Sequence, residues 1–564
     1  MNQLQSFSTG ASSPFNEIEL NMGSTTTTSV SKTKLHEYNS AIQRARDAFA
    51  SGITKNILFR KEQLKQLYKL IDENELQFVD TLKSDLNKPK FESVMTEVDF
   101  VLNDIRSTLN NLESWTRPKF VSKCFVTLVD DNYIHYEPYG VVLILGAWNY
   151  PIQLAFSPLV GAIAAGNACV VKPSEVAPAT ARLIQKLMPL YLDREAFHCV
   201  MGDGSCAQAL VASPQIDYVF FTGSSQIGRS IYQTASNNLT PCTLEMGGKS
   251  PVYIDEATCL KGRSGHFDSF LFETMVRRIL WGKYLNTGQT CVAPDYILCT
   301  SYIAERFMKF AQDIIKEFYG DDPISNPDYG RIVNERHYKR LTSLLDSQLL
   351  IGSKVDPKIT TTQIKNHFLG GKYCVDPSGG YFIEPTVIIC HSGFNEPIMQ
   401  SEIFGPILPL VIVQNELEAI NLINSRDKPL SLYIFSTDSK LIRRFQEDTS
   451  SGSICANDTV MHLIAEALPF GGVGKSGIGA YHGKHTFKTF SHQKSVLVRG
   501  FNPVIEWVAK KRYPPYSENH LRRMLRLLRR RKNPIPLSSE STFGLACFIL
   551  GAFVCYIYML SSRM

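Results

Sequence analysis

The sequence predicts an α/β fold with two doubly wound lobes, and three observations support this fold class. Short apolar runs alternate with helix-like segments between residues 141 and 221, as expected of a parallel sheet covered by helices. The same alternation resumes after residue 245. The chain also has 564 residues, which is more than one hydrophobic core normally organises. We therefore expect two α/β lobes with smaller elements beside them.

The first lobe is predicted to open with helices and to continue as a parallel sheet. Apolar residues recur at helical intervals between about residues 33 and 115. Val141–Leu145 is a continuous apolar run that ends at Gly146, which is typical of a buried parallel strand. The segments that follow are a helix at 154–165, a strand at 168–171, a helix at 178–190 and a strand at 218–221. This order predicts a Rossmann-like sheet.

A second α/β lobe is predicted after Glu245. Residues 252–254 form a short apolar run, and residues 272–284 form a long helical segment that leads towards Cys291. Between them, residues 257–268 are expected to form a polar surface insertion. If this insertion disturbed the helix, the geometry around Cys291 would change.

The positive charge of the chain is concentrated near its C-terminus. The net charge is +6, and residues 510–532 hold ten Lys and Arg against Glu518 alone. The rest of the chain is therefore close to neutral, which argues against nucleic acid as the ligand. The thirteen cysteines show neither CxxC pairs nor metal-like spacing with histidine, so we expect no metal site and no disulfide framework. A reducing compartment is the natural interpretation.

Both ends of the chain are predicted to lie outside the folded body. Residues 1–34 are rich in Ser, Thr, Gly and Asn without an apolar run, so we expect a disordered extension and no signal peptide. Residues 543–560 form an uncharged apolar run that as a helix would span about 27 Å, close to the bilayer core of about 30 Å. A buried core helix is the alternative, but the position behind a charged linker favours a transmembrane anchor. The basic residues before it place the body in the cytosol.

A basic linker and an amphipathic helix are predicted at residues 501–540. Leu521, Leu525 and Leu528 fall on one face of this helix, and arginines surround the rest. A solvated basic helix is the simplest interpretation. Beside a membrane anchor, the same pattern equally favours binding to anionic lipid.

Two motifs supply candidate chemistry. Asn286–Cys291 (NTGQTC) places a thiol among small polar residues. Leu244–Lys249 (LEMGGK) places a carboxylate beside two glycines, where the backbone can approach another group closely. A thiol nucleophile and a carboxylate base are the minimum apparatus for a reaction through a thioester.

These motifs, with Pro138–Gly140 and Trp148–Pro151 before them, closely resemble the aldehyde dehydrogenase superfamily. Gly483–Phe487 and Val460–His462 resemble its class 3 branch, which includes membrane-anchored fatty aldehyde dehydrogenases. The resemblance extends from about residue 35 to 500.

The resemblance implies catalytic roles for three residues. Cys291 would attack the aldehyde carbon, and Glu245 would deprotonate the water that releases the acid. The Asn149 side-chain amide and the Cys291 backbone N–H would stabilise the oxyanion. Without the resemblance, Cys291 would be taken as a small buried hydrophobe, Glu245 as a structural carboxylate and Asn149 as a turn residue.

The resemblance also implies NAD as the cofactor. A turn after a predicted strand would open a helix whose N–H groups face phosphate. The residues of this turn are Gly223, Ser224 and Gly228. Lys172 and Glu175 match positions that hold the adenine ribose, where a carboxylate favours NAD, although NADP remains possible because some members use both. Glu402 would bind the nicotinamide-side ribose, and Phe404 would hold the ring.

The resemblance further implies how the chain divides and that it forms a homodimer. The expected parts are an NAD-binding domain at 35–244 with a bridging hairpin at about 121–137, a catalytic domain at 245–456, and a bridging and oligomerisation segment at 457–500. One departure is the separation of 46 positions between Glu245 and Cys291, which exceeds the family's usual spacing. The surplus falls in the insertion at 257–268.

The predicted function is NAD-dependent oxidation of long-chain aliphatic aldehydes to carboxylic acids at a membrane surface. A long-tailed aldehyde partitions into the bilayer, so an anchored enzyme meets it at a raised local concentration. The alternative substrate is an aromatic or apocarotenoid aldehyde. Alternatives of other classes are a non-catalytic membrane-tethered scaffold and a cysteine-dependent hydrolase, which would work without NAD. Either the endoplasmic reticulum or the mitochondrial outer membrane fits the anchor.

Overall fold

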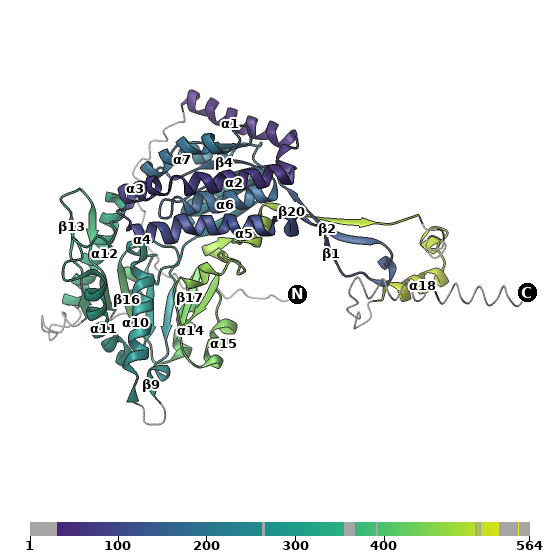
Figure 1. Ribbon diagram of the computed structural model, residues 1–564. Helices are drawn as coiled ribbons and strands as arrows, with labels where there is room; N and C mark the ends of the chain where they lie inside the picture. Colours follow the sequence, from purple (N-terminus) through teal and green to yellow (C-terminus); the bar gives the residue numbers. More distant parts are fainter. Residues whose placement is uncertain are drawn as a thin grey trace, which may run out of the picture. The chain divides into compact units, whose positions relative to one another are not determined.

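The computed structural model describes residues 31–261, 266–354, 367–390 and 393–501, together with 503, 506, 509–529 and 551. The chain divides into two compact units. The larger unit comprises residues up to 116 and residues 136–492, and the smaller comprises residues 117–135 and residues from 493 onwards. The larger unit holds two α/β layered structures (Figure 1).

The first sheet of the larger unit has the strand order β19-β7-β6-β3-β4-β5. Its strands are β3 (Val141–Leu145), β4 (Ala168–Lys172), β5 (Phe197–Cys199), β6 (Tyr218–Gly223), β7 (Cys242–Met246) and β19 (Gly477–Ile478). All run parallel except β19, which is antiparallel to β7. The predicted strands therefore lie side by side as a Rossmann-like sheet, which confirms this part of the predicted fold.

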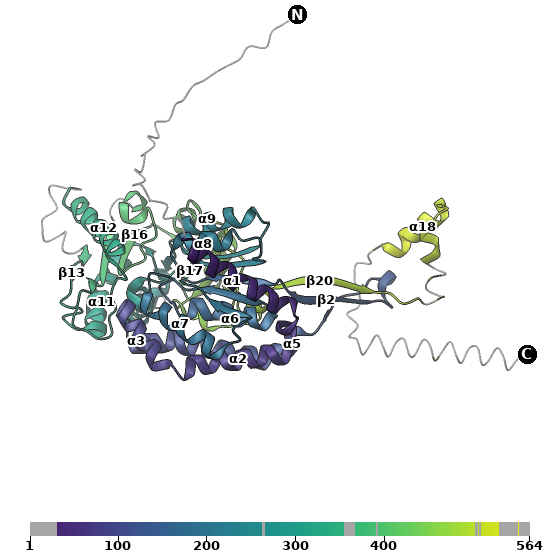
Figure 2. The same ribbon diagram turned by 90° about the horizontal axis from the view of Figure 1, so that it is seen from above.

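Helices cover both faces of this sheet because successive strand residues point to opposite sides. On β3, Val142 and Ile144 pack into one core, whereas Val141, Leu143 and Leu145 pack into the other. The helices of the first core are α2 (Ile57–Asp72), α3 (Glu75–Leu86), α5 (Asp99–Thr116), α6 (Gln153–Ala165) and α7 (Pro178–Tyr191). Those of the second core are α1 (Lys32–Ala50), α8 (Gly204–Val211) and α9 (Ser225–Ser236). In Figure 2, the helices α8 and α9 are seen on one side and the helices α6 and α7 on the other.

The second sheet of the larger unit has the strand order β12-β15-β16-β11-β8-β17-β18. Its strands are β8 (Pro251–Ile254), β11 (Tyr296–Cys299), β12 (Phe368–Leu369), β15 (Thr386–Cys390), β16 (Ile407–Ile412), β17 (Ser431–Phe435) and β18 (Ser453–Ala456). Only β12, at one edge, is antiparallel to its neighbour. A short separate hairpin joins β13 (Tyr373–Val375) and β14 (Tyr381–Ile383).

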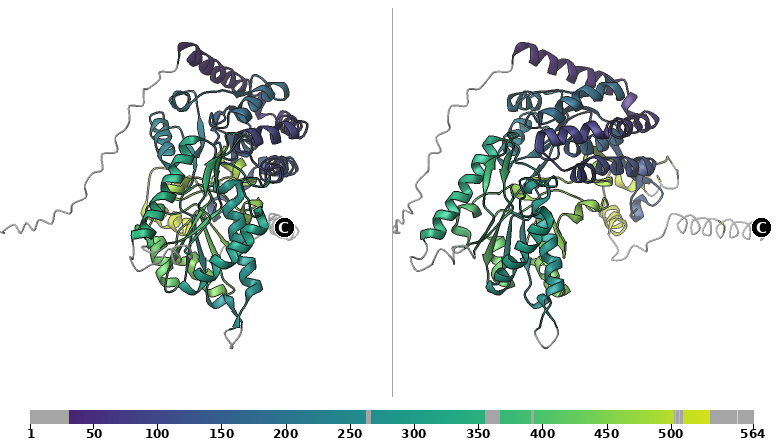
Figure 3. Two further views of the ribbon diagram at one scale, coloured as in Figure 1. Left: turned by 90° about the vertical axis from the view of Figure 1, so that its left-hand side faces the viewer. Right: turned by 60° about the vertical axis from the view of Figure 1, so that its left-hand side comes forward.

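Helices also cover both faces of the second sheet (Figure 3). One core contains α10 (Ser269–Tyr284) and α11 (Ser301–Tyr319). The opposite core contains α12 (Glu335–Lys354), α14 (Glu416–Asn424) and α15 (Ser439–Asp448). The second α/β lobe is thus present as predicted.

The segment expected as a surface insertion, residues 257–268, is partly packed. It forms a short 3-10 helix at Ala257–Cys259 and a hairpin of β9 (Leu260–Lys261) and β10 (His266–Phe267). Thr258 and Cys259 are buried. The helix α10 begins directly afterwards at Ser269 and reaches Tyr284, so the helix that leads to Cys291 is not disturbed.

The smaller unit is organised around a sheet of order β1-β2-β20. These strands are β1 (Lys119–Phe120), β2 (Asp131–Pro138) and β20 (Ser491–Val498), and the last two begin or end in the larger unit. Asp130 is buried and forms an ion pair of 2.6 Å with Arg499. The helix α18 (Glu518–Leu528) exposes about half of each of Leu521, Leu525 and Leu528.

Two of the predicted terminal segments lie largely outside the described residues. These are the extension, described only from residue 31, and the anchor at 543–560, described only at Gly551. Within the described part of the chain, no helix is long and apolar enough to cross a membrane.

Candidate active site

Loops from both sheets of the larger unit supply the candidate site. In the first sheet, Lys172 ends β4, Asn149 follows β3, and Glu245 lies near the end of β7. These strands are parallel, so all three residues lie at the carboxyl edge, where open α/β sheets bind ligands. The chain then crosses through residues 247–250 to the start of β8 at Pro251.

In the second sheet, the candidate residues precede strands. Cys291 lies between α10 and β11, and Glu402 lies in the loop before β16. The site is therefore assembled from the carboxyl edge of one sheet and the amino edge of the other. Residues that are far apart in the sequence meet there because the chain crosses between the sheets at this point.

The thiol of Cys291 and the carboxylate of Glu245 face each other. Glu245 is 1% exposed, and within the described structure neither of its oxygens receives a hydrogen bond of ordinary geometry. Burial raises the pKa of Glu245 to about 7, and the Cys291 thiol partly opposes this rise. Cys291 is partly exposed, yet surrounding protein raises the pKa of its thiol well above the usual value. The charges of Glu245 and Glu402 add to that rise, so the resting thiol is neutral.

A glycine allows Glu402 to reach the same site. A Cβ atom on Gly247 would lie only 2.2 Å from Oε1 of Glu402, so no larger residue fits at position 247 without moving this carboxylate. Burial, and then the charge of Asp295, raise the pKa of Glu402 to about 8. The close approach expected beside the two glycines of the LEMGGK motif is thus made by Glu402.

The segment before Cys291 has an unusual backbone. Asn286 and Thr287 have φ values of 51° and 56°, and Gly288 has 74°. Left-handed conformations of residues other than glycine cost about 1–3 kcal/mol each and cluster at active sites. Gly288 is required, because a Cβ atom there would lie 2.3 Å from the carbonyl oxygen of Gly405.

Asn149 lies beside this segment. Its Nδ2 donates a hydrogen bond of 3.1 Å to the backbone oxygen of Gln289, and the hydroxyls of Tyr150 and Thr290 are 2.7 Å apart. Asn149 is 4% exposed. The structure therefore brings Asn149, Cys291 and Glu245 together, as the sequence motifs indicated.

The residues assigned to the dinucleotide fit that ligand. Ser224 caps α9, and the first turn of this helix lies at the carboxyl edge of the sheet, an arrangement that binds phosphate. A Cβ atom on Gly228 would lie 2.5 Å from Sδ of Met246, so this glycine allows α9 to pack against β7. Nζ of Lys172 lies 2.8 Å from Oε2 of Glu175, the more exposed of the two.

A cavity of about 720 Å³ connects the first turn of α9 to Glu402. Its lining includes Ser225 at the start of α9, Gly247, Gly248 and Glu402. Phe404 lies nearby with a φ of 49°, and its ring packs edge-on against Trp148, with centroids 5.4 Å apart. The cavity thus places the first turn of α9, expected at a phosphate, and Glu402, expected at a ribose, around one hollow.

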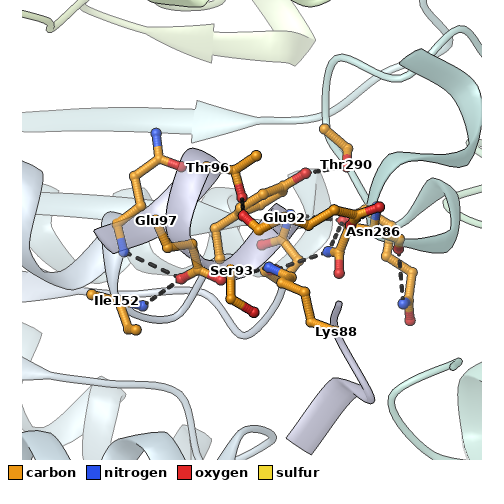
Figure 4. Close-up of polar contacts among 12 residues, drawn as sticks. Lys88, Glu92, Ser93, Thr96, Glu97, Ile152, Asn286 and Thr290 are labelled. Carbon is orange, nitrogen blue, oxygen red and sulfur yellow. Dashed lines mark hydrogen bonds and ion pairs between the residues drawn. The ribbon is translucent and has the colours of Figure 1, made fainter. Parts of the chain in front are cut away.

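Sequence reasoning missed a polar cluster behind the site, formed by the buried Lys88 and Glu97 and the partly exposed Glu92 (Figure 4). The side chains of Lys88 and Glu97 form an ion pair and are 0% exposed. Glu92 accepts a hydrogen bond of 2.8 Å from the backbone N–H of Asn286. Charged residues in a helical stretch are normally solvent-facing, so the sequence carried no signal for this cluster.

The chain is similar in sequence to proteins of one known family. The protein-family model described as "Aldehyde dehydrogenase family" matches residues 13–496 of this chain. Aldehyde dehydrogenase family 3 member A2 of Pongo abelii is 42% identical over 479 residues, covering 85% of this chain and 91% of the relative. The "dimeric NADP-preferring" aldehyde dehydrogenase of Mus musculus is 43% identical, covering 85% and 97%.

Solved structures give the same result. The substrate-bound AldH of Staphylococcus aureus has a TM-score of 0.75 and 42% identity, covering 82% of this chain and 94% of that one. An indole-3-acetaldehyde dehydrogenase in complex with NAD+ has a TM-score of 0.71 and 23% identity, covering 83% and 90%. The latter supports the fold alone.

Proposed function

This chain belongs to the aldehyde dehydrogenase family, and on that premise we propose that it oxidises long-chain aliphatic aldehydes to carboxylic acids at a membrane surface, with NAD as the preferred cofactor. Family membership confirms the predicted class 3 resemblance, the enzyme class and the use of NAD(P). The substrate, the membrane location, the homodimer and the residue roles are the proposal. The observation that carries the proposed chemistry is the pairing of the partly exposed thiol of Cys291 with the buried carboxylate of Glu245.

We assign the nucleophile to Cys291. Its thiol is neutral at rest, so the proton must leave before or during attack on the aldehyde carbon. Glu245 faces the thiol and has a pKa of about 7, which makes it the base next to the sulfur at neutral pH. Partial exposure of Cys291 also lets its proton pass to solvent.

The new carbon–sulfur bond leaves a negative charge on the substrate oxygen. The Asn149 amide and the Cys291 backbone N–H are the proposed donors to this oxyanion, and one such donor typically contributes about 10²–10³ in rate. The dinucleotide, when bound, accepts the hydride that leaves the former aldehyde carbon. Lys172, Glu175, the turn at Gly223–Gly228, Glu402 and Phe404 would hold it.

The remaining acyl group is bound to Cys291 as a thioester. Its hydrolysis needs a base at the moment when water adds, because water is a weak nucleophile. Glu245 is the proposed base, since its carboxylate lies against the sulfur that carries the acyl group. Loss of the acid then restores the thiol.

A substrate series tests the proposed specificity. NADH formation is measured with hexadecanal, hexanal and benzaldehyde, and repeated with NADP. We expect kcat/KM for hexadecanal to exceed the others by about tenfold or more, because each buried methylene contributes about 0.8 kcal/mol. We expect NAD to be preferred, because Glu175 would repel a 2′-phosphate. A preference for benzaldehyde would favour an aromatic substrate instead.

Membrane attachment is tested by flotation with lipid vesicles. We expect the full chain to float with neutral and anionic vesicles at any salt concentration. Deletion of residues 541–564 should leave binding to anionic vesicles alone, through the leucines and arginines of α18, and salt should abolish it because these charges are exposed. Salt-resistant flotation of the deletion variant would contradict the assignment of 543–560 as the anchor.

A further inference from the structure

We propose that the buried ion pair of Lys88 and Glu97 is a positioning device for Asn149, an inference that rests on the oxyanion role proposed above for Asn149. Nζ of Lys88 lies 2.5 Å from Oε1 of Glu97, and both side chains are 0% exposed. A fully buried ion pair is a weak source of stability, because lost hydration offsets the attraction between the charges. The contacts of this pair with the backbone give it a more specific role.

The two charges hold both ends of the turn from β3 into α6 (Figure 4). Nζ of Lys88 donates a hydrogen bond of 3.0 Å to the backbone oxygen of Asn149 and lies 4.1 Å from the ring centre of Tyr150. Oε2 of Glu97 accepts hydrogen bonds from the backbone N–H groups of Ile152, at 2.8 Å, and Gln153, at 3.4 Å. The backbone of residues 149–153 is thus fixed by one buried pair.

The same turn is tied to the segment that carries the thiol. Nδ2 of Asn286 donates a hydrogen bond of 2.9 Å to the Asn149 backbone oxygen, which therefore accepts from both Asn286 and Lys88. The backbone N–H of Asn286 is held in turn by Glu92. Glu92 lies on α4 (Lys90–Ser93), and Glu97 lies on the adjoining π-helical turn η2 (Val94–Val98). Such irregular helical turns occur frequently at functional sites.

This arrangement fixes the Asn149 amide relative to Cys291. Lys88 and Glu97 set the backbone of Asn149, while Glu92 and Asn286 set the left-handed segment before Cys291. A displacement of about 1 Å between reacting groups can lower a rate about 100-fold. Glutamine at position 97 would keep one acceptor oxygen, so it would either leave Lys88 unpaired or release the backbone N–H groups of Ile152 and Gln153. In both cases the amide of Asn149 would lose its fixed position.

A double-mutant cycle between Glu97→Gln and Asn149→Ala tests the proposal. The measured quantity is the rate of the first turnover of NADH at saturating aldehyde and NAD. We expect Glu97→Gln alone to lower this rate about 10- to 100-fold with little change in the dissociation constant of NAD. In the Asn149→Ala background, Glu97→Gln should lower the first-turnover rate less than about threefold, because Glu97 acts through the Asn149 donor, which is already absent.

Asp217→Asn is the matched control. Asp217 also pairs with a cation, Arg46 at 2.8 Å, and accepts a hydrogen bond from a backbone N–H, that of Val141 at 2.7 Å. It lies outside the catalytic loops, so we expect its variant to keep the first-turnover rate. If Glu97→Gln does not fold, the variant Lys88→Met/Glu97→Gln removes both charges together and avoids an unpaired buried charge.

The outcomes separate this proposal from the proposed function. Equal losses from Glu97→Gln in both backgrounds, or no loss, overturn the positioning role while aldehyde oxidation stands. An unchanged rate in Asn149→Ala overturns the oxyanion role and the positioning role with it. Absence of aldehyde turnover in the wild type overturns the proposed function itself.

Discussion

Replacement of Cys291 by alanine is expected to abolish NAD-dependent aldehyde oxidation. The substitution removes the proposed nucleophile, and loss of the nucleophile of a serine protease lowers kcat by about 10⁶. The change is small in volume, so the fold and the binding of NAD should persist. Steady-state NADH formation, NAD titration and thermal unfolding measure these three properties separately.

Cys299→Ala is the control for this prediction. Cys299 is a buried thiol on the strand β11, which follows the catalytic loop. It faces the core of the second lobe, so its loss should affect stability slightly and turnover little. Persistent oxidation in the Cys291→Ala variant would show that another group forms the covalent bond, or that none forms.

Replacement of Glu245 by glutamine is expected to lower steady-state turnover by about 10²–10⁴, the usual contribution of a general base. The rate of thioester hydrolysis should fall most, since water must lose a proton as it adds to the thioester carbon. Formation of the thioester should be slowed less, because Cys291 can lose its proton to solvent. A first turnover of NADH followed by a near halt is therefore the expected time course.

The pH dependence of turnover tests the same role of Glu245 as a base. A base acts when it is deprotonated, so turnover of the wild type should rise as pH increases through about 7, the raised pKa of Glu245. Asp104 is another buried carboxyl with a pKa of about 7, raised by burial. Asp104→Asn should keep the inflection, whereas Glu245→Gln should remove it. If Asp104→Asn removed the inflection and Glu245→Gln kept it, the titrating group would be Asp104 and not Glu245.

The sheets were predictable because their strands are continuous apolar runs bounded by turns. The run Val141–Leu145 was predicted with the same bounds that the structure gives. The start of α10 was placed later than observed, because Asp268 caps the helix by accepting from the N–H of Leu271, and a capping side chain extends a helix beyond its apolar pattern.

The candidate site was predictable in part, through its motifs. These placed Cys291, Glu245 and Asn149 on separate segments, and the sheet crossing brings the segments together. The burial of Lys88 and Glu97 could not be foreseen, because it depends on a turn more than fifty positions away in the sequence. The left-handed backbone of Asn286 could not be predicted for the same reason, since Asn286 is held by hydrogen bonds to Glu92 and Asn149, which are far away in the sequence.

The central claim, a thioester on Cys291 that Glu245 helps to hydrolyse, is tested most directly by mass spectrometry of the Glu245→Gln variant. The variant is mixed with hexadecanal and NAD, quenched in acid after one turnover and digested. We expect one hexadecanoyl group on the peptide that contains Cys291, absent without NAD and absent when Cys291 is also replaced. An unmodified Cys291 in a sample that has formed one equivalent of NADH would contradict the account.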